Sequence, residues 1–189
     1  MRKRPKRPID KELFAAGDEQ SVNASALDTP ERVLAYCQQR GFSDGVATDI
    51  QELIEDNVDL RLDFEDIGKF DAFIEKMEDG HYRIVVNSRH SITRQRFSMA
   101  HEYVHFQVHR NDIQGMPRGE RILYRSDERD TTEYQANQYA AEILMPELAF
   151  KQVARATNGD ISEIAKEFQV SPLAVRFRAK TLRIPGHGF

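Results

Sequence analysis

Residues 91–110 read SITRQRFSMAHEYVHFQVHR, a stretch without proline or glycine in which apolar residues recur every three or four positions. This spacing predicts an α-helix, and Ser91 or Thr93 can cap its N-terminus. Large apolar side chains also occupy most of the other faces, which is typical of a helix buried in a core. We therefore expect the rest of the fold to be built around this helix.

Two histidines of this helix, His101 and His105, are four residues apart and so lie on one face, with Glu102 beside them. Imidazole and carboxylate groups are costly to bury without partners, and a metal ion would provide the partner. The spacing H-E-x-x-H is typical of zinc sites in which the glutamate is a general base. The sequence therefore predicts that His101 and His105 bind zinc and that Glu102 is catalytic.

A catalytic zinc site needs a third protein ligand and an open position for water. The segment TEYQANQYAAEILMP at 132–146 predicts a second helix that ends near Pro146, the expected start of the next one. Ala136 and Ala140 are small and would let this helix approach the first one closely. That approach would bring Glu133 to the histidine pair, so Glu133 is our candidate third ligand.

Other residues could take part in the site. Asp127, Asp130 and His109 are rival ligands, but His109 lies one turn beyond the second histidine, and we assign it an outer, supporting role. Asn137, one turn after the candidate ligand, would either steady that ligand or simply pack. Glu142 falls on the opposite face, and we expect it in solvent.

The segments RQRFSMAHEYVHFQVH at 94–109 and EYQANQYAAEILMP at 133–146, with the strand-like YRIVVN at 82–87, resemble the ImmA/IrrE family of zinc-dependent metallopeptidases. The resemblance extends over about residues 28–180, although only the two helices are specific. The family commonly has a small residue at the fourth position of the motif, where this chain has Val104. A valine there fits a buried helix.

The resemblance implies that His101, His105 and Glu133 bind one zinc ion and that Glu102 is the base in amide hydrolysis. Members of the family cleave a helix-turn-helix repressor and so relieve repression, and others act in toxin–antitoxin or phage-related modules. The implied partner is therefore a helix-turn-helix repressor or an antitoxin. The alternative is a regulatory protein that binds a partner or DNA and has a structural or vestigial metal site, in which a fourth protein ligand would close the open position.

The composition is that of a globular chain, with 40% hydrophobic residues and no apolar run long enough to span a membrane. The basic start of the chain has no apolar segment after it, so we expect no secretory signal. Cys37 is the single cysteine and lies in an apolar helical pattern. It suits a core position in a reducing compartment, and we expect a cytoplasmic protein.

The charge is unevenly distributed, with 27 basic and 31 acidic residues, and five of the basic ones lie in RKRPKR at 2–7. The rest of the chain is therefore acidic, which does not favour a broad nucleic-acid surface. We expect residues 1–27 to form a basic, disordered tail and linker. The tail could contact nucleic acid, but we favour a solvated terminus.

We predict an α+β fold, a mainly helical zincin-like domain at 28–150 with a small antiparallel sheet before the metal helix. Thr29 and Gly41 mark the ends of a first helix, and a second is expected from Ser43 to Asn57. Strands are predicted at 59–64, 70–77 and 82–87. A polar connection at 111–130, with a short strand at 121–125, would border the cleft.

Residues 151–189 are predicted to form a helical, helix-turn-helix-like extension packed on the first domain. Helices are expected at 146–157, 161–168 and from Ser171 onward, although Gln169 stands where such a turn prefers glycine. Arg176 and Arg178 give the last helix a basic character. DNA binding through them is an alternative, but we favour a structural or partner-docking role.

Overall fold

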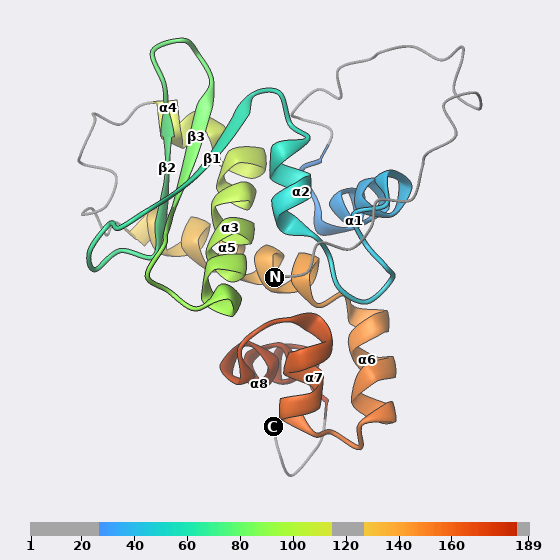
Figure 1. Ribbon diagram of the computed structural model, residues 1–189. Coiled ribbons are helices and arrows are strands. Elements are labelled where there is room, and N and C mark those ends of the chain that lie inside the picture. Colours follow the sequence, from blue (N-terminus) through green and yellow to red (C-terminus); the bar gives the residue numbers. More distant parts are fainter. Residues whose placement is uncertain (1–26, 115–126, 185–189) are drawn as a thin grey trace, which may run out of the picture.

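The computed structural model describes residues 27–114 and 127–184 and has an α+β fold, as predicted (Figure 1). The predicted tail at 1–26, the short strand at 121–125 and residues 185–189 lie outside the described residues. The elements in chain order are α1 Pro30–Arg40, α2 Ile50–Glu55, β1 Leu60–Glu65, β2 Ala72–Lys76, β3 Tyr82–Asn87, α3 Ile92–Val108, α4 Arg110–Gln114, α5 Asp127–Leu144, α6 Glu147–Ala156, α7 Ile161–Phe168 and α8 Pro172–Thr181. No helix in the described ranges is long and apolar enough to cross a membrane.

The first helix, α1, has the ends that its sequence predicts. The hydroxyl of Thr29 accepts a hydrogen bond from the backbone N–H of Arg32 at 3.4 Å, and Pro30 occupies the first turn, where its missing N–H costs nothing. Gly41 ends the helix with a φ of 76°, a left-handed conformation that glycine adopts without strain.

The second helix is shorter than predicted, because α2 begins at Ile50 and not at Ser43. The carboxylate of Asp44 accepts hydrogen bonds from the backbone N–H groups of Val46 at 2.9 Å and Ala47 at 2.8 Å. Such local side-chain contacts stabilise a turn in competition with a helix. Ser43 therefore pairs with Thr48 in an isolated antiparallel bridge, and the helix starts after this turn.

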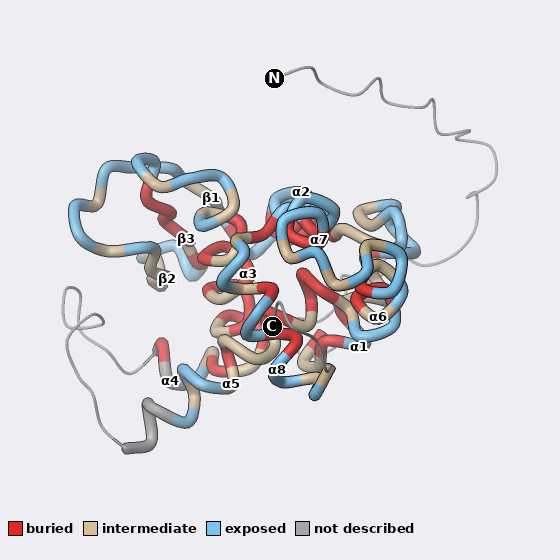
Figure 2. The backbone as a smooth tube through the Cα atoms, turned by 90° about the horizontal axis from the view of Figure 1, so that it is seen from below, coloured by how far each residue is buried: buried red, intermediate tan, exposed pale blue. Residues whose placement is uncertain are grey.

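The sheet is mixed, so the prediction of a purely antiparallel sheet was wrong. Its strand order is β1-β3-β2: β2 and β3 form an antiparallel hairpin, whereas β1 and β3 are parallel. β3 is the most apolar strand and is buried along most of its length, red in Figure 2, which accounts for its central position. The connection from β1 to β2 is held by Asn87, whose side-chain amide donates to the carbonyls of Gly68 at 3.0 Å and Phe70 at 2.7 Å.

The central helix α3 lies between the sheet and α5, with α1 and α2 beyond it (Figure 1). Most of its residues are buried, as its sequence predicts. Ala136 and Ala140 of α5 are completely buried, and their small side chains permit the close packing of α5 against α3. Val104 is also buried, at 2% exposure, so it belongs to the core.

The last three helices form a group at one end of the molecule (Figure 1), where α7 packs against α6 and α8, and α8 also contacts α5. α7 has the predicted bounds, and Gln169 ends it with a φ of 54°, the left-handed conformation usually taken by glycine. The carbonyl of Gln169 accepts a hydrogen bond from Arg96 of α3 at 3.2 Å, and Arg96 also donates to the carbonyl of Thr48 at 2.8 Å. The hydrogen bond from Arg96 to Gln169 thus connects the group of α6, α7 and α8 to α3.

Arg178 of α8 is not at the surface, so it is not available for the DNA binding that the sequence leaves as an alternative to the favoured structural or docking role. It is 2% exposed, and its Nε donates to the backbone carbonyl of Met145 at 3.0 Å, just beyond the end of α5. Its Nη1 lies 3.3 Å from the carboxylate of Glu142. Glu142 is therefore half-buried and paired, so the prediction that it lies in solvent was wrong. A helix end leaves carbonyls without intrahelical partners, and a buried arginine satisfies one of them here.

Candidate metal centre

The two motif histidines point their Nε2 atoms at the same place. His101 and His105 lie one turn apart on α3, their Nε2 atoms are 3.0 Å apart, and their ring centroids are 4.7 Å apart. Four-residue spacing on a helix brings side chains one above the other, so this juxtaposition follows directly from the sequence.

The third member of the cluster, Glu133, comes from α5. One carboxylate oxygen lies 3.2 Å from Nε2 of His101, and the other lies 3.2 Å from Nε2 of His105. One ligand atom from each of the three residues lies within 4.8 Å of the others, and this is the group of potential metal ligands found among the described residues. The structure thus brings together the three residues that the sequence proposes as ligands.

The electrostatics of the cluster favour a cation. Hydrogen bonds from His101 and His105 hold the pKa of the Glu133 carboxyl well below its usual range. Burial alone would lower the pKa of His101, but its hydrogen bond to Glu133 and the neighbouring charge of Glu102 outweigh this effect, so that the pKa is raised. Both shifts have the same cause: the Glu133 carboxylate stabilises a positive charge on the histidines, which is also the interaction that a bound metal ion would have with it.

The donor set fits a zinc ion. Two imidazole nitrogens and a carboxylate oxygen are the ligands of many catalytic zinc sites, in which a fourth position stays open. The histidine side chains are 16% and 12% exposed, whereas the Glu133 side chain is 54% exposed. The site is therefore enclosed on the side of α3 and open to solvent beside Glu133, where a fourth position would be accessible.

Residues behind the histidines hold their rings. Nδ1 of His101 lies 3.1 Å from the Oδ1 of Asn137, which is one turn after Glu133 on α5. Nδ1 of His105 lies 3.1 Å from Nδ1 of His109. Contacts of this kind fix the orientation of metal-binding imidazoles. Asn137 and His109 thus contact the ring nitrogens of His101 and His105 that point away from Glu133.

The glutamate of the motif, Glu102, is buried at 9% exposure. Burial raises the pKa of its carboxyl above the ordinary value, and the nearby His101 and His105 oppose this rise. A carboxylate with a raised pKa is a stronger base than one in water, and this is the property that a general base requires.

The rival ligands take no part in the cluster as far as the structure describes them. His109 faces the outer nitrogen of His105 and not the point where the three ligand atoms meet. The side chains of Asp127 and Asp130 lie outside the described residues. Sequence reasoning missed Gln135, whose Oε1 lies 3.0 Å from Nε2 of His109. No periodicity marks this glutamine, because its contact depends on how α3 and α5 cross.

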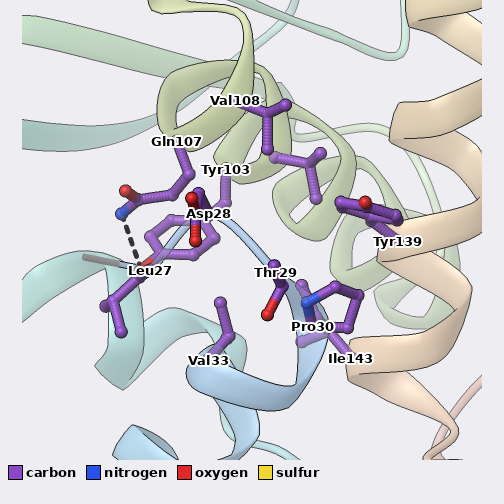
Figure 3. A pocket seen from close by; sticks show the side chains of 11 residues that line it. Leu27, Asp28, Thr29, Pro30, Val33, Tyr103, Gln107, Val108, Tyr139 and Ile143 are labelled. Carbon is purple, nitrogen blue, oxygen red and sulfur yellow. Dashed lines mark hydrogen bonds between the residues drawn. The ribbon is translucent and has the colours of Figure 1, made fainter. Parts of the chain in front are cut away.

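Two hollows elsewhere in the molecule are separate from the cluster. One, of about 10 Å³, lies where the start of α1 meets α3 and α5, and Tyr103 accepts a hydrogen bond from Gln107 at its wall (Figure 3). This volume is enough for about one water molecule. The other, of about 210 Å³, is polar and lies between the 41–49 segment, Arg96 and Gln169. Neither is lined by the histidines of the motif or by Glu133.

Comparisons with known proteins found a matching family model and a solved structure of similar fold. The family model Peptidase_M78, described as the IrrE N-terminal-like domain, matches residues 55–180. No curated protein matches the chain. Among solved structures, a Mycobacterium tuberculosis transcriptional regulator has a similar fold, with a TM-score of 0.61 and 17% sequence identity over 82% of this chain and 48% of that one. This chain thus spans about half the length of that regulator, and the likeness concerns the fold alone.

Proposed function

The chain belongs to the Peptidase_M78 family, that of the IrrE N-terminal-like domain, and from this premise we propose that it is a zinc-dependent metallo-endopeptidase. The observation that carries the proposal is the meeting of His101, His105 and Glu133 beside the buried Glu102. Three ligands with an accessible fourth side are what a catalytic site needs, whereas a structural zinc site is closed by a fourth protein ligand.

The proposed roles of the residues follow from their positions. His101, His105 and Glu133 hold the zinc ion, and Asn137 and His109 orient the two imidazoles. When bound, the ion supplies Lewis acidity, which makes water acidic near neutral pH and polarises the carbonyl of the scissile bond. The three ligands and Glu102 belong to α3 and α5, and His109 caps the C-terminus of α3, so the packing of α3 against α5 sets the geometry of the reaction.

Glu102 is the proposed general base. Its carboxylate accepts a proton from the attacking water and later delivers that proton to the nitrogen of the leaving amine. Burial supports this role because it raises the pKa of the carboxyl towards the range in which one group both takes up and releases a proton near neutral pH.

The proposed substrate is an intracellular protein, a helix-turn-helix transcriptional repressor whose cleavage relieves repression. The support is the family and the open side of the site at Glu133, which leaves room for a polypeptide to approach. The buried single cysteine, Cys37, suits the cytoplasm that such a substrate implies.

The function can be tested with a proteome-derived peptide library and mass spectrometry. The zinc-loaded protein should generate new peptide ends, and Glu102→Gln should abolish them while the zinc content is unchanged. Glu167→Gln is the matched control, because it makes the same change at an exposed glutamate of α7 that is not part of the cluster. Equal cleavage by the wild type and Glu102→Gln would refute the proposed mechanism.

The second candidate is a regulator in the toxin–antitoxin or phage class, acting through a partner or DNA with a structural or vestigial metal site. It is favoured by the fold of the M. tuberculosis transcriptional regulator and by the exposed Arg176, Lys180 and Arg183 near the end of the chain. The burial of Arg178 reduces the basic surface of α8 and weighs against DNA. Zinc binding without any cleavage would favour this candidate.

A further inference from the structure

A chain of polar contacts continues outward from His105 and ends on α5. His109 is buried, with 7% exposure, and its Nδ1 lies 3.1 Å from Nδ1 of His105. Its other nitrogen, Nε2, lies 3.0 Å from the Oε1 of Gln135. The rings of the two histidines are 5.0 Å apart, so the three side chains form one continuous path from the cluster to α5.

When a metal is bound, the positions of the protons on the two imidazoles fix which group donates each hydrogen bond along this path. A neutral imidazole has one N–H donor and one acceptor nitrogen. If Nε2 of His105 binds zinc with its lone pair, then its Nδ1 carries the proton and donates to Nδ1 of His109. His109 then carries its own proton on Nε2 and donates to the amide oxygen of Gln135, which has no proton to offer. Each donor along the path meets an acceptor.

We propose that Gln135 is a positioning residue of the metal centre, acting through His109 to hold His105 in the tautomer and orientation that bind zinc. This inference rests on the proposed function and extends it to a residue that makes no contact with the ligand atoms. The direct partner of His105 is an imidazole, which can present either a donor or an acceptor at Nδ1. Gln135 turns its amide oxygen towards His109 in the structure, and in this orientation Nε2 of His109 is the donor and Nδ1 of His109 is left as an acceptor for His105.

The same helix then serves both histidines. Asn137 places an amide oxygen directly on Nδ1 of His101, whereas Gln135 reaches His105 through one intervening ring. Both residues lie within four positions of Glu133 on α5. α5 therefore supplies the ligand Glu133 and also the amide oxygens that end the hydrogen-bond paths from His101 and His105. In this way the sequence of α5 specifies the tautomers of both histidines on α3.

The test is the affinity of the full-length protein for zinc, measured by competition with a chromophoric chelator. Loss of an outer partner of a metal-binding histidine typically weakens binding by about 10–100-fold. We expect this loss in His109→Ala and a loss of about 10-fold in Gln135→Leu, which has a similar size but no acceptor. Gln135→Glu keeps an acceptor and should bind zinc at least as tightly as the wild type. Gln138→Ala, a glutamine of the same helix outside the path, is the matched control.

A second measurement separates positioning from a loss of fold. Two-bond ¹H–¹⁵N NMR spectra of the zinc-loaded protein should show His105 protonated on Nδ1 and His109 protonated on Nε2, with a mixture of tautomers at His109 in Gln135→Leu. Circular dichroism reports whether each variant is folded. Equal zinc affinity of the wild type, Gln135→Leu and His109→Ala would overturn this inference while the proposed zinc site stood. Failure of the wild type to bind zinc would overturn both.

Discussion

Replacement of Arg178 by alanine should destabilise the whole protein, although Arg178 lies in a helix that its sequence marks as a basic surface. The side chain is 2% exposed, donates to the carbonyl of Met145 and pairs with Glu142. Its substitution removes the partner of a helix-end carbonyl, leaves a half-buried carboxylate without its cation and opens a cavity between α5 and α8.

The cost can be estimated from these contacts. A hydrogen bond from a charged group contributes about 1.5–3 kcal/mol. Breaking a fully buried ion pair costs about 3–5 kcal/mol, but the side chain of Glu142 is 32% exposed, so solvent screening leaves a fraction of that amount. We therefore expect a loss of about 3 kcal/mol in the free energy of unfolding. For a chain of this size that loss corresponds to a decrease in Tm of roughly 6–12 °C.

Urea denaturation followed by circular dichroism is the assay, and Arg176→Ala is the matched control because it removes an exposed arginine of the same helix. The control should change the free energy of unfolding by less than about 0.5 kcal/mol. Arg178→Lys keeps the charge without the planar fork and should lie between the two. Equal stability of Arg178→Ala and Arg176→Ala would refute the assignment of Arg178 to the interior.

Three further predictions concern other parts of the molecule. Cys37 is completely buried, and burial raises its pKa to about 12, so its thiol should react with Ellman's reagent only after unfolding; rapid reaction of the native protein would contradict this placement. Gln169→Gly should raise the Tm, because glycine adopts the left-handed φ of 54° without the strain of about 1–2 kcal/mol that other residues have there. This gain exceeds the entropy cost of glycine, about 0.5–1 kcal/mol, and a decrease in Tm would show that the side chain of Gln169 matters more. Removal of zinc by a chelator should lower the Tm, because the ion binds only the folded arrangement of α3 and α5. The loss is equivalent to about 4 kcal/mol when zinc had been present at about 1,000 times its Kd. If the protein is shown to have lost its zinc and its Tm is unchanged, zinc binding is not coupled to folding.

Local features of the fold could be predicted from the sequence where a particular backbone position favours a particular type of residue. Thr29, Pro30 and Gly41 define the ends of α1, and the spacing of His101 and His105 places both rings on one face of α3. These contacts join residues no more than a few positions apart, so the sequence alone contains the necessary information.

Features that depend on segments far apart could not be predicted in the same way. The chain passes from β1 at one edge of the sheet to β2 at the other edge, and β3 then lies between them, parallel to β1. No residue of β1 indicates this pairing. Arg178 shares the inner face of α8 with Val175 and Ala179, but its contacts with Met145 and Glu142 depend on how α8 packs on α5. Gln135 is recognisable only once the crossing of α3 and α5 has placed it beside His109.

The central claim is that His105 of α3 and Glu133 of α5 bind one metal ion together. It is tested most directly by the zinc content of the purified protein, measured by inductively coupled plasma mass spectrometry in the wild type, His105→Ala, Glu133→Ala and the control His81→Ala, which changes a histidine near the β2–β3 turn. The account predicts about one zinc ion per chain in the wild type and the control, and loss of the ion in both ligand variants. Absence of zinc from the wild type after zinc has been supplied would contradict it.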